Sequence, residues 1–198
     1  AAKYDDSRWI IEPFFHLYDC CQENDGAAAV IVVPADRVRD FPHKPAMVLA
    51  CAQGCDHRSA APVHNMPNYP SSHFAQLAPR LYDMAKLTPA DMGIVQCYEN
   101  FTGGVLMSLV EHGLVHAEAA NEFLVPENLL APGGKMPLNT SGGNLAECYM
   151  HGLELVIESV RQIRGTAINQ VKRNDAAIII GGPMVTPVSS LILGSEAV

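Results

Sequence analysis

Residues 176–183 are Ala-Ala-Ile-Ile-Ile-Gly-Gly-Pro, an apolar run that ends in two glycines and a proline. A short run of this kind, bounded by residues that break regular structure, predicts a strand buried on both faces. The run at residues 27–33 predicts a second doubly buried strand, and the run at 47–52 a third. Shorter apolar runs predict two more strands, at residues 93–98 and 190–193.

Segments with helical periodicity lie between these runs. Ser71 and Ser72 can cap a helix that Pro79 kinks or restarts and whose apolar face would carry Phe74, Leu77, Leu81 and Ala85. A second helix is expected to end at Gly113 and to turn inward the side chains of Val105, Leu106, Leu109 and Val110. Residues 54–70 have no period and are expected to form a long loop.

The longest helix is expected at about residues 145–164, with Gly165 as its C-cap. Its apolar stripe would consist of Leu145, Tyr149, Leu153, Val156, Val160 and Ile163. Its solvent-facing side would carry Glu147, Glu154, Glu158 and Arg161. Apolar strands that alternate with helices predict an α/β protein with helices on both faces of the sheet.

Composition excludes several classes of protein. The chain has 198 residues, of which 48% are apolar and 17% charged, so it can fill a sizeable core and is not expected to be disordered. Its net charge of −8 argues against binding to nucleic acid. No apolar run approaches the roughly 20 residues that span a bilayer. Without an export signal at its start, the chain is expected to be cytoplasmic.

The cysteines and histidines predict no metal site. The six cysteines are irregularly spaced, which is not typical of a secreted disulfide scaffold. Cys51, Cys97 and Cys148 lie in apolar segments and are expected to behave as small hydrophobic residues. The set Cys51, Cys55, His57 and His64 matches no zinc spacing. His112 and His116 are four positions apart, but Gly113 ends the expected helix between them. Both are therefore expected at the surface.

Two segments could carry chemistry. In the first, residues 97–104, Tyr98 lies at the end of an expected strand, where α/β sheets place functional groups; Tyr98 could equally be a core aromatic residue. In the second, residues 139–152, Gly142 and Gly143 allow close approach of the backbone, and Tyr149 follows within the first turns of the expected helix. The plain alternative there is a capped helix with Tyr149 in the core. The chain lacks a phosphate-binding loop, a dinucleotide fingerprint and a serine nucleophile elbow.

The second segment resembles the C-terminal signature of thiolases. Asn139, Gly142, Gly143 and Gly152 fit its frame, but Tyr149 stands where thiolases have the histidine of a Gly-His-Pro triplet. Residues 98–101, Tyr-Glu-Asn-Phe, resemble the thiolase Asn-Glu-Ala-Phe motif, with Tyr98 in place of the residue that helps to hold the thioester oxygen. The late cysteine base of thiolases is also missing from residues 178–183.

These departures together resemble the thiolase-like, lipid-transfer-protein-type aldolases of steroid side-chain degradation. Further segments that fit are residues 7–10, 19–21, 25–28, 133–137 and 163–165. The resemblance implies a layered α-β-α thiolase-like fold and covers the C-terminal half of such a protein. Residues 1–26 would then be an irregular lead-in from a missing or separate N-terminal half, and residues 27–198 the C-terminal domain.

The resemblance also implies an activity. It is retro-aldol cleavage of a β-hydroxyacyl-CoA, here a steroid side-chain thioester, to a ring ketone and propionyl-CoA. Tyr98 and Tyr149 would be catalytic, with Tyr149 as base or proton shuttle and Tyr98 as donor to the enolate or hydroxyl, although the opposite assignment is open. The matched positions imply substrate binding by Asn139, Gly142, Gly143 and Cys148.

Partners follow from the same resemblance. It implies a homodimer and a small zinc-ribbon and OB-fold partner protein, with no cofactor in this chain and any zinc in the partner. Two alternatives stay open. One is a degenerate thiolase or acyl-CoA condensing enzyme, and the other is a non-catalytic subunit that binds acyl-CoA or lipid.

Overall fold

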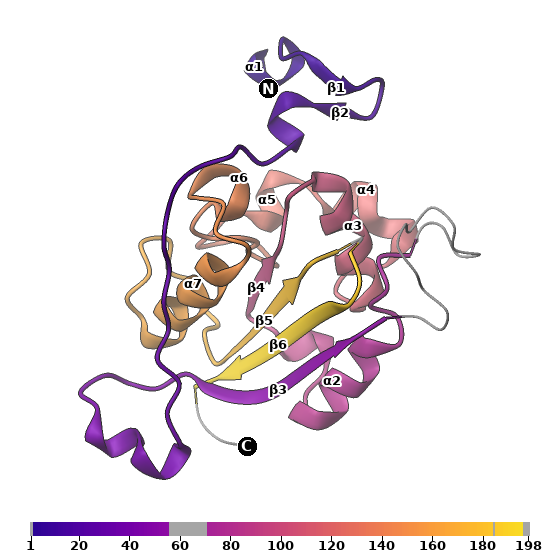
Figure 1. Cartoon of the computed structure of the whole chain (residues 1–198). Helices are drawn as coiled ribbons and strands as arrows, with labels where there is room; N and C mark the ends of the chain where they lie inside the picture. Colours follow the sequence, from indigo (N-terminus) through magenta and orange to yellow (C-terminus); the bar gives the residue numbers. More distant parts are fainter. Residues whose placement is uncertain (1, 56–70, 184, 196–198) are drawn as a thin grey trace.

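A computed structural model describes residues 2–55, 71–183 and 185–195 (Figure 1). Its main sheet has four strands in the order β3-β6-β5-β4. The strands are β3 (Met47–Gly54), β4 (Ile94–Cys97), β5 (Ala176–Gly181) and β6 (Val188–Gly194). β4 and β5 are parallel, whereas β6 runs antiparallel to both of its neighbours, so the sheet is mixed.

Helices lie on both faces of this sheet, as the alternation of strands and helices predicts. α2 (Leu77–Ala85) packs on β3 and β6, while α7 (Leu153–Arg164) packs on β5, β4 and β6. The remaining helices are α1 (Ala2–Asp5), α3 (Thr102–Glu111), α4 (Ala120–Phe123), α5 (Pro126–Leu129) and α6 (Gly143–Ala146). Short 3-10 helices are η1 (Leu17–Asp19), η2 (Ala35–Asp40), η4 (Pro89–Asp91) and η5 (Ala117–Ala119).

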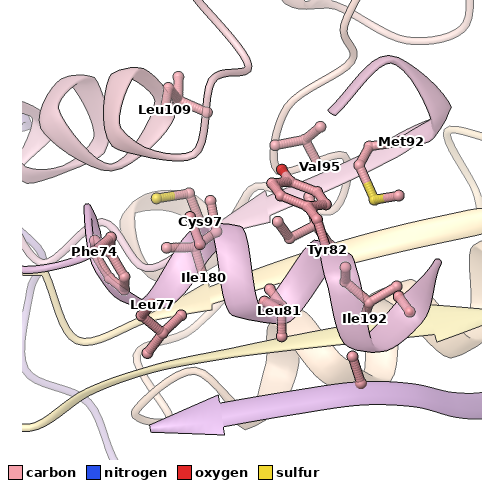
Figure 2. Packing of buried hydrophobic residues seen from close by; sticks show 14 of the residues in the cluster. Phe74, Leu77, Leu81, Tyr82, Met92, Val95, Cys97, Leu109, Ile180 and Ile192 are labelled. Carbon is pink, nitrogen blue, oxygen red and sulfur yellow. The ribbon is translucent and has the colours of Figure 1, made fainter. Parts of the chain in front are cut away.

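The core is divided by the alternation of side chains along the strands. In β5, Ile178 and Ile180 pack against the side that holds α2 and α3, together with Leu81 and Leu109 (Figure 2). Ala177 and Ile179 point to the other face, where Leu155 and Ile163 of α7 cover them; the whole group is Ile94, Tyr98, Leu155, Ile163, Val171, Ala177, Ile179 and Leu193. Each face of the sheet therefore has its own hydrophobic cluster.

The N-terminal region lies apart from this sheet. α1 is followed by a small hairpin of β1 (Trp9–Ile11) and β2 (Phe15–His16) and by η1. Residues 21–34 then run without regular secondary structure past α6 and α7 (Figure 1). Gly26 packs against Met150, which lies between α6 and α7, because a Cβ at residue 26 would lie 2.8 Å from the sulfur of Met150.

The strand predicted at residues 27–33 is wrong. Ile31 and Val32 are 85% and 80% exposed, and no described strand pairs with this segment. Branched side chains favour a strand only where a neighbouring strand supplies hydrogen bonds and packing. The other four predicted strands are confirmed, and β5 is buried as expected. β3 is not buried on both faces, because it is an edge strand that exposes Val48 and Cys51.

The long helix predicted at residues 145–164 is interrupted. α6 ends at Ala146 and α7 begins at Leu153, with a turn between them. His151 and Gly152 have φ of +54° and +89°, which a continuous right-handed helix cannot contain. Gly165 is confirmed as the C-cap of α7, with φ of +74°. The water-facing prediction holds for Glu147 and Arg161, whereas Glu154 and Glu158 are buried.

Smaller corrections concern α2 and α3. α2 begins at Leu77 instead of after Ser72, because Glu111 accepts hydrogen bonds from the backbone of Ser72 and Phe74 and holds that segment in a loop. Leu106 of α3 is 39% exposed, although Leu109 is fully buried as predicted. The loop expected at residues 54–70 lies almost entirely outside the described residues.

Candidate functional site

Tyr98 lies immediately after β4 and is held by the sheet. Its backbone N–H donates to the carbonyl of Ile180 at 2.8 Å, which continues the pairing of β4 with β5 beyond Cys97. The ring belongs to the hydrophobic cluster under α7 and is 8% exposed. Gly152 packs on this ring, since a Cβ at residue 152 would lie 3.3 Å from Cδ2.

Tyr149 lies in the turn between α6 and α7. Its backbone N–H donates to Oδ1 of Asn24 at 2.7 Å, and its ring stacks on His151 with centroids 4.9 Å apart. The hydroxyl of Tyr98 donates to the hydroxyl oxygen of Tyr149 at 2.7 Å. The fold thus brings together two phenols that are 51 positions apart in the sequence.

The two phenols differ in environment. Burial, followed by the hydrogen bond to Tyr149, raises the pKa of Tyr98 well above that of a free tyrosine. Tyr98 therefore keeps its proton at neutral pH and acts as a hydrogen-bond donor. Tyr149 is half-buried and lines a hollow of about 520 Å³. Of the two tyrosines, only Tyr149 lines that hollow.

The N-terminal segment supplies the far wall of this hollow. Its lining residues are Glu23, Asn24, Gly26, Ala27, Ala28, Tyr149, Met150, His151 and Leu153. A second hollow of about 480 Å³ shares His151 and Leu153 with the first and continues over the α7 face of the sheet to Ile179 and Leu191. Tyr149 thus lines the first hollow, which adjoins the more apolar second one.

Cys21 is a neighbour of the phenols that sequence reasoning did not assign to the site. Its N–H donates to the carbonyl of Asn100 at 3.1 Å, which fixes it beside the chain that follows Tyr98. Its sulfur interacts with the hydroxyl of Tyr149, and burial raises the pKa of its thiol. The adjacent pair Cys20-Cys21 was visible in the sequence, but nothing in its spacing indicated that it would reach residue 149.

Asn139, Gly142 and Gly143 shape the segment between the two tyrosines. The Asn139 amide bonds both backbone polar groups of Cys97, accepting from its N–H at 2.7 Å and donating to its carbonyl at 2.8 Å. Gly142 has φ of +109° and precedes α6. A Cβ at Gly143 would overlap Oε1 of Glu99, so the close approach at this glycine is to a carboxyl group of the same chain.

Glu99 is a buried acid beneath this turn. Oε1 accepts from the N–H of Leu145 at 3.5 Å, while Oε2 has no hydrogen-bond partner among the described residues. Burial raises the pKa of Glu99 to about 7. Cys148, the fourth residue expected to bind substrate, is half-buried just before Tyr149, and its N–H donates to Gly143. Substrate binding by these positions remains a prediction.

The residues considered for a metal are not gathered in the described part of the chain. No group of three or more potential metal ligands occurs there, and His57 and His64 lie outside it. The surface position predicted for His112 is wrong, because it is 1% exposed and bonded to Ser108 and Ser190. His116 is exposed as predicted. None of the helices in the described ranges is long and apolar enough to cross a bilayer.

Comparison with known proteins identifies the family. A family model described as thiolase C-terminal domain-like matches residues 52–195. The chain belongs to the thiolase C-terminal domain-like family. This membership confirms the thiolase-like fold expected from the resemblance.

Two relatives of the chain are named as an aldolase and a lyase. The chain is 40% identical to a steroid side-chain-cleaving aldolase of Thermomonospora curvata, over 98% of this chain and 49% of the relative. It is 37% identical to the 17-hydroxy-3-oxo-4-pregnene-20-carboxyl-CoA lyase of Mycobacterium tuberculosis, over 96% of this chain and 49% of the relative. The chain therefore spans about half the length of these relatives.

Solved structures agree with this assignment. The structure described as Ltp2-ChsH2(DUF35) aldolase superposes with a TM-score of 0.89 at 38% identity, covering 98% of this chain and 50% of that one. Human mitochondrial 3-ketoacyl-CoA thiolase superposes with a TM-score of 0.52 at 18% identity, covering 82% of this chain and 34% of that one. The second likeness concerns the thiolase-like fold alone.

Proposed function

We propose that the protein containing this chain is a carbon–carbon lyase that cleaves a β-hydroxyacyl-CoA by a retro-aldol reaction. The substrate class is a steroid with a hydroxyl on the ring and a CoA thioester in the side chain, giving a ring ketone and propionyl-CoA. The observation that carries the proposal is the 2.7 Å contact between the hydroxyls of Tyr98 and Tyr149 beside a hollow. The names of the two relatives supply the reaction class.

The reaction needs one proton removed and one returned. A base takes the proton of the β-hydroxyl. The oxygen of that hydroxyl then becomes the carbonyl oxygen of the ketone as the carbon–carbon bond breaks. The electrons of the broken carbon–carbon bond pass to the thioester as an enolate, and a proton then reaches the α-carbon. The number of protons held by the protein is the same before and after the reaction, so a pair of phenols can serve both steps.

The environments of the phenols favour one assignment of roles. Tyr98 has a raised pKa and keeps its proton, which suits a hydrogen-bond donor that stabilises the enolate oxygen. Tyr149 lines the hollow, which suits the base or proton shuttle that meets the substrate hydroxyl. The reaction as proposed requires no metal or cofactor in this chain.

The test uses the complete protein and measures release of propionyl-CoA and ring ketone from a steroid side-chain CoA thioester. Tyr98→Phe and Tyr149→Phe are each expected to lower kcat by about 100-fold or more, because each removes a proton-transfer or donor group. Tyr82→Phe is the matched control, since Tyr82 is equally buried, also donates a hydrogen bond, and lies on the opposite face of the sheet. Wild-type activity in either site variant would refute the assignment.

Two further arms separate the alternatives. Cleavage of acetoacetyl-CoA would favour a degenerate thiolase. Tight binding of the steroid thioester without turnover, with every other subunit present, would favour a non-catalytic subunit.

We further propose that the complete protein is a homodimer that works in the cytoplasm with a small zinc-ribbon and OB-fold partner. The solved structure described as Ltp2-ChsH2(DUF35) aldolase supports the existence of a partner. Light scattering of the purified assembly would test how many copies of this protein and how many copies of the partner it contains. A monomer that is fully active without any second protein would contradict the proposal.

A further inference from the structure

Asn144 of α6 and Glu154 of α7 are buried polar residues that the mechanism above does not use. Each is 3% exposed, and the hydrogen bonds of their side chains go to groups other than the hydroxyls of Tyr98 and Tyr149. A buried carboxyl group is unfavourable unless hydrogen bonds compensate for its lost hydration. Its partners are therefore informative.

The two side chains form a continuous set of hydrogen bonds. The N–H of Glu99 donates to Oδ1 of Asn144 at 3.2 Å, and Nδ2 of Asn144 donates to Oε1 of Glu154 at 2.6 Å. The N–H of Gly152 donates to both carboxylate oxygens of Glu154, at 3.2 and 3.1 Å. The set thus runs from the residue after Tyr98 to the last residue of the turn that carries Tyr149.

This connection bears on the geometry of the phenols. Glu99 is bonded to Tyr98 in the chain, and Gly152 packs against the Tyr98 ring with a φ of +89°. The turn at residues 147–152 has no regular hydrogen-bond ladder of its own. The C-terminal end of the turn is fixed by the hydrogen bond from Gly152 to Glu154. Its N-terminal end follows α6, and Asn144 of α6 accepts a hydrogen bond from Glu99, just after β4.

We propose that Asn144 and Glu154 act together as positioning residues that hold the hydroxyls of Tyr98 and Tyr149 in contact. The catalytic consequence rests on the proposed retro-aldol function; the positioning itself does not. Because a misplacement of about 1 Å can cost roughly 100-fold in rate, loss of this pair lowers kcat more than it changes KM.

The pattern of donors allows a sharp test. Asn144 must accept from Glu99 and donate to Glu154, which must accept from Gly152. Asn144→Asp places two carboxyl groups together at the 2.6 Å contact, and Glu154→Gln gives the amide of Asn144 or the N–H of Gly152 a poorer acceptor. The double variant satisfies every position again. Its carboxylate at position 144 would accept from the N–H of Glu99 and from the amide introduced at position 154, whose oxygen would accept from Gly152.

The expected results are specific to the pair. In the complete enzyme, Asn144→Asp is expected to lower kcat by about 100-fold and Glu154→Gln by about 10-fold, with KM within about 2-fold. The double variant is expected to recover to within about 3-fold of wild type. Glu158→Gln is the control, because Glu158 is equally buried one turn later in α7 but bonds Thr140 and Gln162. It is expected to lower Tm with kcat within about 2-fold of wild type.

A second measurement does not need activity. In protein labelled with ¹³C at tyrosine Cζ, the resonances of Tyr98 and Tyr149 are expected to shift in each single variant and to return in the double variant. If the wild type cleaves no steroid thioester, the proposed function fails while these spectra still test the positioning. A double variant that folds without recovering the resonances, or a double variant that fails to fold, overturns the positioning role. So does a kcat loss in Glu158→Gln as large as in Glu154→Gln.

Discussion

Glu99 lies beneath the turn at Gly142 and Gly143, and its carboxyl group occupies the space that a Cβ at residue 143 would need. Gly143 also has φ of +55°, a conformation that costs a residue with a side chain about 1 kcal/mol. Two independent physical reasons therefore select glycine here. The close approach expected from the Gly-Gly pair exists, and it is made within the chain.

We expect Gly143→Ala to lower the free energy of unfolding by about 2–4 kcal/mol, since the overlap with Glu99 adds to the backbone strain. Gly165→Ala is the matched control, because Gly165 has φ of +74° but no atom within 4 Å of the added Cβ. That change is expected to cost only about 1 kcal/mol. Urea unfolding of both variants measures the difference. Equal losses of unfolding free energy would mean that the Glu99 side chain moves aside at little cost.

Tyr149 depends on a contact that lies far away in the sequence. Its N–H donates to Asn24, which belongs to the N-terminal segment that also carries Cys21. Replacing Asn24 by alanine removes this acceptor and leaves an N–H that must find water. The side of the hollow opposite α7 is therefore part of what orients Tyr149.

We expect Asn24→Ala to lower kcat for the proposed cleavage by about 3- to 10-fold, with a change in the free energy of unfolding below about 1 kcal/mol. Gln22→Ala is a suitable control, because Gln22 is exposed and its side chain donates to the nearby carbonyl of Cys20. Equal activity in the two variants would show that Asn24 does not orient the tyrosine.

At the scale of elements, β5 shows how one strand serves two cores. Ile178 and Ile180 face α2 and α3, while Ala177 and Ile179 face α7, so every residue from 176 to 180 is buried. Leu155 anchors α7 on this strand and is fully buried. α7 in turn presents Glu154 to the site from its first turn.

We expect Leu155→Ala to cost about 2–5 kcal/mol of unfolding free energy, because a fully buried leucine leaves a cavity. Leu106→Ala in α3 makes the same chemical change at a side chain that is 39% exposed, and it is expected to cost about 1 kcal/mol or less. Denaturant melts of the two variants compare them directly. A similar loss of unfolding free energy in both variants would mean that the buried Leu155 side chain contributes no more to stability than the exposed Leu106 side chain.

These elements also show what the sequence could predict. Apolar runs between breakers located four strands of the main sheet, because a buried strand has a local signature. The same signature misplaced a strand at residues 27–33, since pairing depends on a neighbour that the local pattern does not contain. The stripe over residues 145–164 has helical spacing, but His151 and Gly152 adopt positive φ and break it.

The candidate site divides in the same way. Tyr98 and Tyr149 could be selected because they stand at the matched positions of a thiolase-like signature, and the structure places their hydroxyls together. Asn24, Asn144 and Glu154 could not be selected, because their roles come from contacts between separate segments. Glu154 looked like a solvent-facing acid, since charge alone does not indicate that a side-chain amide and a backbone N–H donate to it.

At the scale of the whole molecule, two buried titratable groups oppose each other in the pH dependence of stability. Burial raises the pKa of Glu99 to about 7 and lowers the pKa of His112 to about 4. The folded state holds a proton on Glu99 that the unfolded state releases, so stability falls as pH rises from about 4.5 to 7. His112 acts in the opposite sense, because the unfolded state binds a proton that the folded state refuses as pH falls from about 6.5 to 4.

Each group contributes about 3 kcal/mol across its window, so the two contributions nearly cancel between about pH 4.5 and 6.5. We expect Glu99→Gln to leave the effect of His112 uncovered, so that the unfolding free energy of this variant rises with pH over that range. His112→Gln should show the reverse, a fall in stability as pH rises toward 7. Urea unfolding of both variants and the wild type at constant ionic strength measures the three slopes. Parallel profiles for all three would mean that neither group titrates differently in the folded and unfolded states.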